Sequence, residues 1–149
     1  MIKLYKTEQK IISEIDSYEP DAWIQLTKPT VEESRFIAEK FDIDLADVRA
    51  ALDDEESSRV EVEKNYTLIL VDIPSIEIRN DREAYTTIPL GIILLDQYIV
   101  TVCAEETPVL EAFVERKVRD ISTKKRMRLM YQILYRNCTT YQYYLRDGG

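Results

Sequence analysis

The run Asp53, Asp54, Glu55 and Glu56 is the densest group of potential metal ligands in the sequence. Hard divalent cations such as Mg²⁺ bind oxygen ligands and retain much of their water, so several carboxylates beside a turn can hold such an ion weakly. The run has neither the spacing nor the glycine of an EF-hand loop. The sequence therefore indicates a weak, water-retaining cation site here or, as is more common, a solvated acidic loop.

Most other site chemistry is excluded by composition. The chain has no histidine, which removes Ser–His and Cys–His catalytic centres and His-ligated zinc. Its two cysteines, Cys103 and Cys138, have no evident base, so both are expected to be small buried hydrophobes. Three glycines leave no phosphate-binding loop. Because no pair of acids is placed by its spacing in one cleft, we do not expect an enzyme.

The charge of the 149 residues is uneven. The formal net charge is −8, and residues 1–64 hold 17 acidic against 9 basic side chains. Residues 116–128 instead hold seven basic side chains, opposed only by Asp120. An acidic protein is a poor partner for nucleic acid, so we expect none. The asymmetry suggests a surface that faces cations or a charged partner, with two solvated faces as the alternative.

Hydrophobic periodicity predicts a sheet flanked by helices. A capping box at Thr30–Glu33 begins a helix to about Phe41, Asp44 caps a second short helix, and Thr107-Pro108 begins a third to about residue 119. Strands are expected at residues 2–6, 22–26, 60–63, 66–73, 86–95 and 98–103, with a polar loop at 79–83. Pro89 indicates that its strand lies partly at an edge or bulge. The order predicts an α+β fold in α/β/α layers, with a mixed, largely antiparallel sheet.

A last helix is expected from about residue 122 or 123. Along it, apolar and aromatic residues are spaced by four and three positions, which is the period of coiled-coil packing. These residues are Met127, Tyr131, Leu134, Cys138, Tyr141 and Leu145. The seam is predicted either to bind a partner helix or to pack on the domain's own sheet.

The order of the predicted elements resembles the cytoplasmic domain of CorA-type magnesium transporters. In that domain a Trp-Ile strand leads into a helix, a Phe-Gly-Ile-like turn and a second short helix, followed by strand pairs. The matching segments are 22–26 (Ala-Trp-Ile-Gln-Leu), 29–33 (Pro-Thr-Val-Glu-Glu), 37–43 (Ile-Ala-Glu-Lys-Phe-Asp-Ile), 59–66 (Arg-Val-Glu-Val-Glu-Lys-Asn-Tyr), 88–95 (Ile-Pro-Leu-Gly-Ile-Ile-Leu-Leu) and 98–102 (Tyr-Ile-Val-Thr-Val). Together they cover nearly the whole chain.

The resemblance implies a domain that precedes two transmembrane helices in a homopentameric channel for Mg²⁺ and sometimes Co²⁺. Residues 1–122 then form the domain on the cytoplasmic side of the membrane, and residues 123–149 begin a stalk-type helix. The membrane-spanning part and its Gly-Met-Asn signature are not in this sequence, so we expect a fragment or a stand-alone homologue. The implied roles are cation sensing, gating and oligomer assembly.

The sequence departs from the family pattern where regulatory acids are expected. In the family these acids lie on the second short helix, where this chain has Arg49 and Ala50, and on the early stalk helix, where it has Tyr135, Thr139 and Thr140. The acids of residues 53–56, which lie close to the second short helix in the sequence, are the candidates to replace them as cation ligands. The alternative function is a stand-alone soluble interaction module that uses its C-terminal helix and has no metal role.

Overall fold

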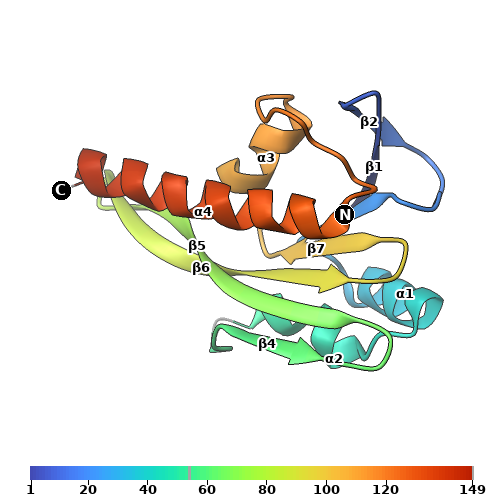
Figure 1. Cartoon of the computed structure of the whole chain (residues 1–149). Coiled ribbons are helices and arrows are strands. Elements are labelled where there is room, and N and C mark those ends of the chain that lie inside the picture. The colour runs from blue at the N-terminus through green and yellow to red at the C-terminus, as the bar shows by residue number, and fades with distance from the viewer. Residues whose placement is uncertain (54, 149) are drawn as a thin grey trace.

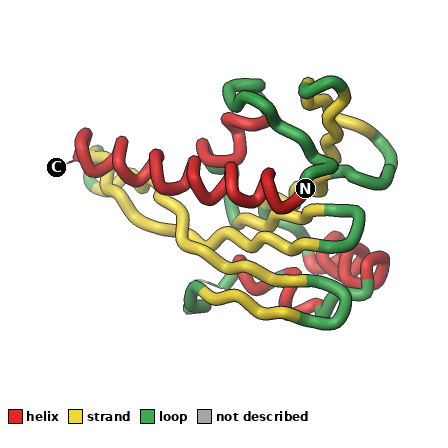
Figure 2. Tube along the Cα trace, in the orientation of Figure 1, coloured by secondary structure: helices red, strands yellow, loops and turns green. Residues whose placement is uncertain are grey.

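The computed structural model describes residues 1–53 and 55–148, with side chains described through Arg146. A seven-stranded sheet lies between two layers of helices (Figure 1 and Figure 2). The strands are β1 (Ile2–Glu8), β2 (Ile11–Ile15), β3 (Trp23–Thr27), β4 (Arg59–Val62), β5 (Thr67–Arg79), β6 (Arg82–Leu94) and β7 (Ile99–Cys103). The helices are α1 (Val31–Phe41), α2 (Leu45–Val48), the short 3-10 helix η1 (Ala50–Leu52), α3 (Pro108–Val114) and α4 (Arg126–Gly148).

The strand order is β2-β1-β3-β7-β6-β5-β4. Neighbouring strands are antiparallel except β3 and β7, which run parallel. A parallel pair needs a long crossover, and here the crossover contains α1, α2, η1 and the β4–β5–β6 meander. The mixed, largely antiparallel sheet with helices on both faces confirms the predicted α+β fold.

One face of the sheet is covered by α1 and α2. The capping box forms as predicted, because Glu33 N donates to Thr30 Oγ1 at 3.1 Å and Thr30 N donates to Glu33 Oε1 at 2.9 Å. The helix ends at Phe41, and the capping residue Asp42 that follows has a left-handed φ of 54°. Ile37 and Ala38 of α1 join buried residues of β3, β5 and β7 in the core on this face.

The opposite face is covered by α3 and α4. Leu129, Met130 and Ile133 of α4 pack into a second core with Trp23 and Phe113. The rings of Trp23 and Phe113 meet edge to face, with centroids 6.0 Å apart. Both faces of the central strands are therefore buried, which explains the continuous apolar runs in their sequences.

Two turns differ from the sequence-based expectation. β2 is absent from the predicted strands, because the turn at Gln9 and Lys10 adopts positive φ (51° and 66°) without glycine or asparagine to indicate it. The predicted polar loop at 79–83 is instead a tight turn at Asn80 and Asp81, with φ of 51° and 61°. β5 and β6 consequently extend as a hairpin to Arg79 and Arg82.

Pro89 is predicted to lie partly at an edge of the sheet, and it does. β6 pairs with β5 along its whole length, but it pairs with β7 only from Leu90 to Leu94. At Pro89 the side of β6 that faces β7 therefore has no partner strand. The absence of an N–H group in proline costs no hydrogen bond between strands there.

The two C-terminal helices are shorter than predicted. α3 ends at Val114 because the chain turns at Arg116, whose φ is 62°. α4 begins at Arg126 rather than at residue 122 or 123. Thr123 instead bonds with Thr7, since each backbone N–H donates to the other residue's hydroxyl at 2.9 and 3.1 Å.

Candidate functional site

The acidic loop between η1 and β4 does not by itself gather its carboxylates. Asp53 Oδ1 accepts a hydrogen bond from Glu55 N at 3.0 Å, and Glu56 forms an ion pair with Arg59 at 2.6 Å. Asp54 lies outside the described residues. Among the residues that the structure describes, Asp53, Glu55 and Glu56 belong to no converging set of three ligands. A cation site at residues 53–56 therefore stays a prediction.

Three acids near this loop do converge. Ligand oxygens of Asp47, Glu61 and Glu63 all lie within 4.8 Å of one another. Glu61 is on β4, and Glu63 follows it two positions later, so an extended chain places both side chains on one face. Asp47 comes from α2 and reaches them only through tertiary packing. We refer to these three residues as the carboxylate triad; oxygens this close suit a hydrated Mg²⁺ ion.

Two neighbours orient and partly neutralise the carboxylate triad. The Tyr66 hydroxyl donates to Asp47 Oδ2 at 2.5 Å and accepts from Asp44 N at 3.3 Å. Burial, followed by the hydrogen bond to Asp47, raises the pKa of Tyr66 to about 12, so the phenol remains a donor at neutral pH. Arg59 Nε donates to Glu61 Oε1 at 2.7 Å. Arg59 also pairs with Glu56 outside the triad, so one guanidinium shared between two glutamates leaves the three carboxylates with a net negative charge.

The positions where the resemblance implies regulatory acids serve other purposes here. Arg49 reaches back to α1 and donates to Ser34 Oγ at 2.8 Å, and Ala50 is buried. On α4, Tyr135 is exposed, and the hydroxyls of Thr139 and Thr140 donate to a carbonyl of the preceding turn. None of these five side chains offers a carboxylate to a cation.

The seam predicted on the last helix lies mostly outside the core. α4 packs on the domain's own sheet, but it does so mainly through the adjacent stripe Leu129, Met130 and Ile133, and Leu134 is the seam residue that packs against this core. The seam residues are either exposed (Met127, Tyr131, Cys138 and Leu145) or half-buried (Leu134 and Tyr141). The expectation of a buried Cys138 is wrong, whereas Cys103 is buried as expected. Binding of a partner through the seam stays a prediction.

Part of the basic segment lines a groove between α3 and α4. The groove has a volume of about 750 Å³, and its lining includes Phe113, Val118, Met127, Tyr131 and Tyr135 together with Lys117, Arg119, Arg128 and Arg136. Two members of the segment also donate hydrogen bonds within the domain. Arg116 donates to the carbonyl of Ile12 at 3.1 Å, and Arg128, which lines the groove, donates to the carbonyl of Asp120. Among the helices of the described residues, none has the length and apolar character required to cross a membrane.

Comparison with known proteins identifies the family of the chain. The model of the family described as CorA-like Mg²⁺ transporter protein matches residues 22–147. The cobalt/magnesium transport protein CorA of Methanocaldococcus jannaschii is 30% identical over 103 residues. That alignment covers 69% of this chain and 30% of the relative, so the chain spans less than a third of the curated relative that it matches.

Solved structures share the fold. The soluble domain of CorA from Methanocaldococcus jannaschii superposes with a TM-score of 0.78 at 22% identity, over 99% of this chain and 59% of that one. The complete CorA magnesium transporter from the same organism gives a TM-score of 0.75 at 21% identity, over 99% and 47% of the two chains. The cytoplasmic domain of ZntB from Vibrio parahaemolyticus gives 0.71 at 13% identity, over 97% and 60%. With its family model matched over most of its length and its fold shared, this chain belongs to the CorA-like Mg²⁺ transporter family.

Proposed function

We propose that this chain acts as the cytoplasmic domain of a CorA-type transporter for Mg²⁺, and for Co²⁺ as a second cation. Its role is to sense the cation, to contribute to gating and to help assemble the subunits, which in the family implied by the sequence form a pentamer. Conduction and membrane anchoring belong to regions of the full-length transporter beyond this domain. The family membership, together with the strongly acidic first part of the chain, supports this role.

The convergence of Asp47, Glu61 and Glu63 carries the sensing part of the proposal. Three carboxylates opposed by one guanidinium repel one another, and a hydrated Mg²⁺ ion relieves that repulsion without losing its water. Asp53 and Glu55, in the loop that precedes β4, add further negative charge nearby in the sequence. Cation binding would then favour the conformation or assembly in which these acids lie close together. No chemical step is involved, because the domain binds the ion and does not transform it.

Thermal melts of the chain in millimolar MgCl₂ test this role, with NaCl at equal ionic strength as the salt control. We expect Mg²⁺ to raise the melting temperature more than NaCl does. The exposed Glu63→Gln variant should lose most of that difference, and Asp53→Asn should reduce it. Glu39→Gln, the same change at an exposed position of α1, is the matched control and should behave as the parent protein. An equal Mg²⁺ response in Glu63→Gln and in the parent would contradict sensing at the carboxylate triad.

The exposed seam of α4 favours a second function, an interaction module without a metal role. Tyr131 is 62% exposed and Leu145 is 73% exposed, an unusual placement for large apolar side chains. Sedimentation at several protein concentrations distinguishes the two functions. The module predicts self-association that is indifferent to EDTA and lost in Tyr131→Asp. Association that instead requires Mg²⁺ would favour the transporter role.

A further inference from the structure

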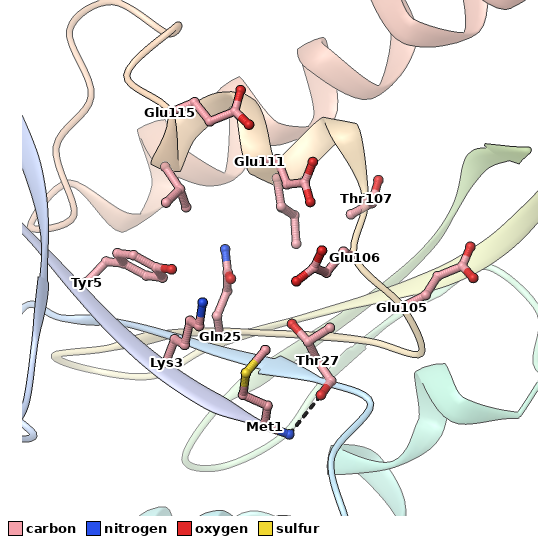
Figure 3. Close-up of a pocket in the computed structure, with 12 residues that line it drawn as sticks. Met1, Lys3, Tyr5, Gln25, Thr27, Glu105, Glu106, Thr107, Glu111 and Glu115 are labelled. Atoms are coloured by element: carbon pink, nitrogen blue, oxygen red, sulfur yellow. Dashed lines mark hydrogen bonds between the residues drawn. The ribbon is translucent and has the colours of Figure 1, made fainter.

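A pocket of about 190 Å³ lies between β1, β3 and α3, away from the carboxylate triad (Figure 3). It belongs to the α3 side of the sheet, whereas α2 packs on the opposite side. The parallel strands β3 and β7 end beside the pocket, at Thr27 and Cys103. Crevices beyond the carboxyl ends of parallel strands are common ligand sites, since the chain leaves the sheet there in different directions.

The pocket carries negative charge that the chain does not neutralise. Glu105, Glu106, Glu111 and Glu115 all line it, and the carboxylates of Glu106 and Glu111 point toward each other (Figure 3). Among the described residues, no basic nitrogen lies within 4.0 Å of the carboxylates of Glu105, Glu106 or Glu111, whereas Glu115 pairs with Lys117 at 2.8 Å. Burial and then the charge of Glu106 raise the pKa of Glu111. The pocket therefore favours a cation.

The hydroxyl of Tyr5 gives an independent indication of a ligand. Tyr5 is only 4% exposed, and its ring packs on Trp23 with centroids 5.8 Å apart. The hydroxyl is directed into the pocket (Figure 3), and it forms no hydrogen bond with any residue in the described part of the chain. The oxygen itself is open to the pocket, so a solvent molecule or a ligand can reach it. A molecule in the pocket would supply the missing partner.

The apolar part of the lining decides which kind of cation fits. Leu110, Val114 and Met1 contribute hydrocarbon surface next to the Tyr5 ring. A hydrated Mg²⁺ ion can approach the carboxylates, but its water shell gains no favourable contact from this apolar surface. An alkylammonium ion suits it better, because its N–H groups can donate to carboxylates while its methylene groups contact the apolar wall and the aromatic ring. Lys3 is the single lysine or arginine among the lining residues described. Glu115 is paired with Lys117, and Glu105 accepts a hydrogen bond from Ser75 Oγ at 2.6 Å, so Glu106 and Glu111 are the carboxylates left for a ligand.

We propose that this pocket binds a linear aliphatic amine with two or more ammonium groups, a ligand of the polyamine class. One ammonium group lies between Glu106 and Glu111, and its neighbour donates to the Tyr5 hydroxyl oxygen. The intervening methylene groups pack against Leu110 and Val114. The proposal is independent of the Mg²⁺ response at the carboxylate triad, because the two sites use different residues on different elements.

Calorimetric titration of the full chain with spermidine tests the proposal, with MgCl₂ and NaCl titrated at equal ionic strength. We expect saturable spermidine binding with one molecule per chain. Glu111→Gln and Glu106→Gln should each weaken the affinity about tenfold or more, because each removes a hydrogen bond to a charged group. Tyr5→Phe deletes only the hydroxyl and should weaken it about threefold to tenfold. Glu39→Gln on α1 is the charge-matched control and should bind as the parent protein does.

Circular dichroism of each variant verifies folding. If one of the two glutamate variants fails to fold, the other still tests the proposal. Three results would overturn the proposal: no saturable spermidine binding, spermidine affinity unchanged in both glutamate variants, or Mg²⁺ binding at least as tightly with the same sensitivity to Glu106→Gln and Glu111→Gln. The last result would identify an inorganic cation site. A missing Mg²⁺ response in Glu63→Gln concerns the other site and leaves this proposal unaffected.

Discussion

The indole Nε1 of Trp23 donates a 2.9 Å hydrogen bond to Oγ1 of Thr101, and both side chains are fully buried. The two residues belong to β3 and β7, the one parallel pair among the described strands. The bond therefore joins β3 to β7, the strand that returns after the crossover. It also satisfies a polar atom inside an otherwise apolar core.

Thr101→Val should reduce stability by about 1–3 kcal/mol, because it leaves the indole N–H buried without an acceptor. Urea denaturation followed by tryptophan fluorescence measures the loss. Thr101→Ser keeps the hydroxyl and removes one methyl group, so its loss should be smaller. A valine variant as stable as the parent protein would show that water or a rearrangement satisfies the indole.

Tyr66 should make stability depend on alkaline pH. Its pKa is raised to about 12 in the folded protein from an ordinary value of 10, so the protonated phenol is favoured by folding. The contribution is complete below pH 10 and should be lost as the pH rises through about 12. Urea denaturation between neutral and alkaline pH measures it. The difference between the parent protein and Tyr66→Phe should show this phase, and the difference for the exposed Tyr143→Phe should not.

Gly91 should tolerate very little added volume. A Cβ at this position of β6 would lie 3.3 Å from the Cβ of Ala51 in η1 and 3.8 Å from that of Val102. Gly91→Val should therefore cost about 1–3 kcal/mol by overpacking. Gly91→Ala should cost less, and combining it with Ala51→Gly should recover part of the loss. Additive effects of the alanine and glycine changes in thermal melts would contradict this contact.

The two stripes of α4 should respond differently to truncation. Ile133 is fully buried against the sheet, so Ile133→Ala should destabilise the domain by about 2–5 kcal/mol. Tyr131 is 62% exposed, and Tyr131→Ala should change stability by less than about 0.5 kcal/mol. Chemical denaturation of both variants measures the contrast. A large loss for Tyr131→Ala would mean that the groove between α3 and α4 contributes to the fold.

Neutralising Glu111 should stabilise the ligand-free protein. The pKa of this carboxyl is raised by burial and by Glu106, so its ionised form opposes folding. Glu111→Gln should therefore melt at a higher temperature at neutral pH, and the difference should disappear as the pH falls below about 4.5, where both states are protonated. A glutamine variant that melts lower than the parent at neutral pH would contradict the repulsion.

The local elements of this protein were determined by sequence alone. The Thr30–Glu33 capping box and the Thr107-Pro108 start involve only neighbouring residues, so their hydrogen bonds formed as predicted. Apolar runs likewise indicated the buried strands. The family followed from the order of these elements, and the match to residues 22–147 confirms it.

The groupings of side chains, in contrast, were decided by tertiary structure. β2 depends on a left-handed turn at Gln9 and Lys10 that no glycine indicates. Asp47 meets Glu61 and Glu63 only because α2 packs beside β4, and Tyr5 faces Glu111 only because α3 returns over β1. Periodicity shows which face of an element is apolar, but it carries no information about which distant polar residues share a surface. That depends on the strand order and the crossover, which place residues more than a hundred positions apart within one pocket.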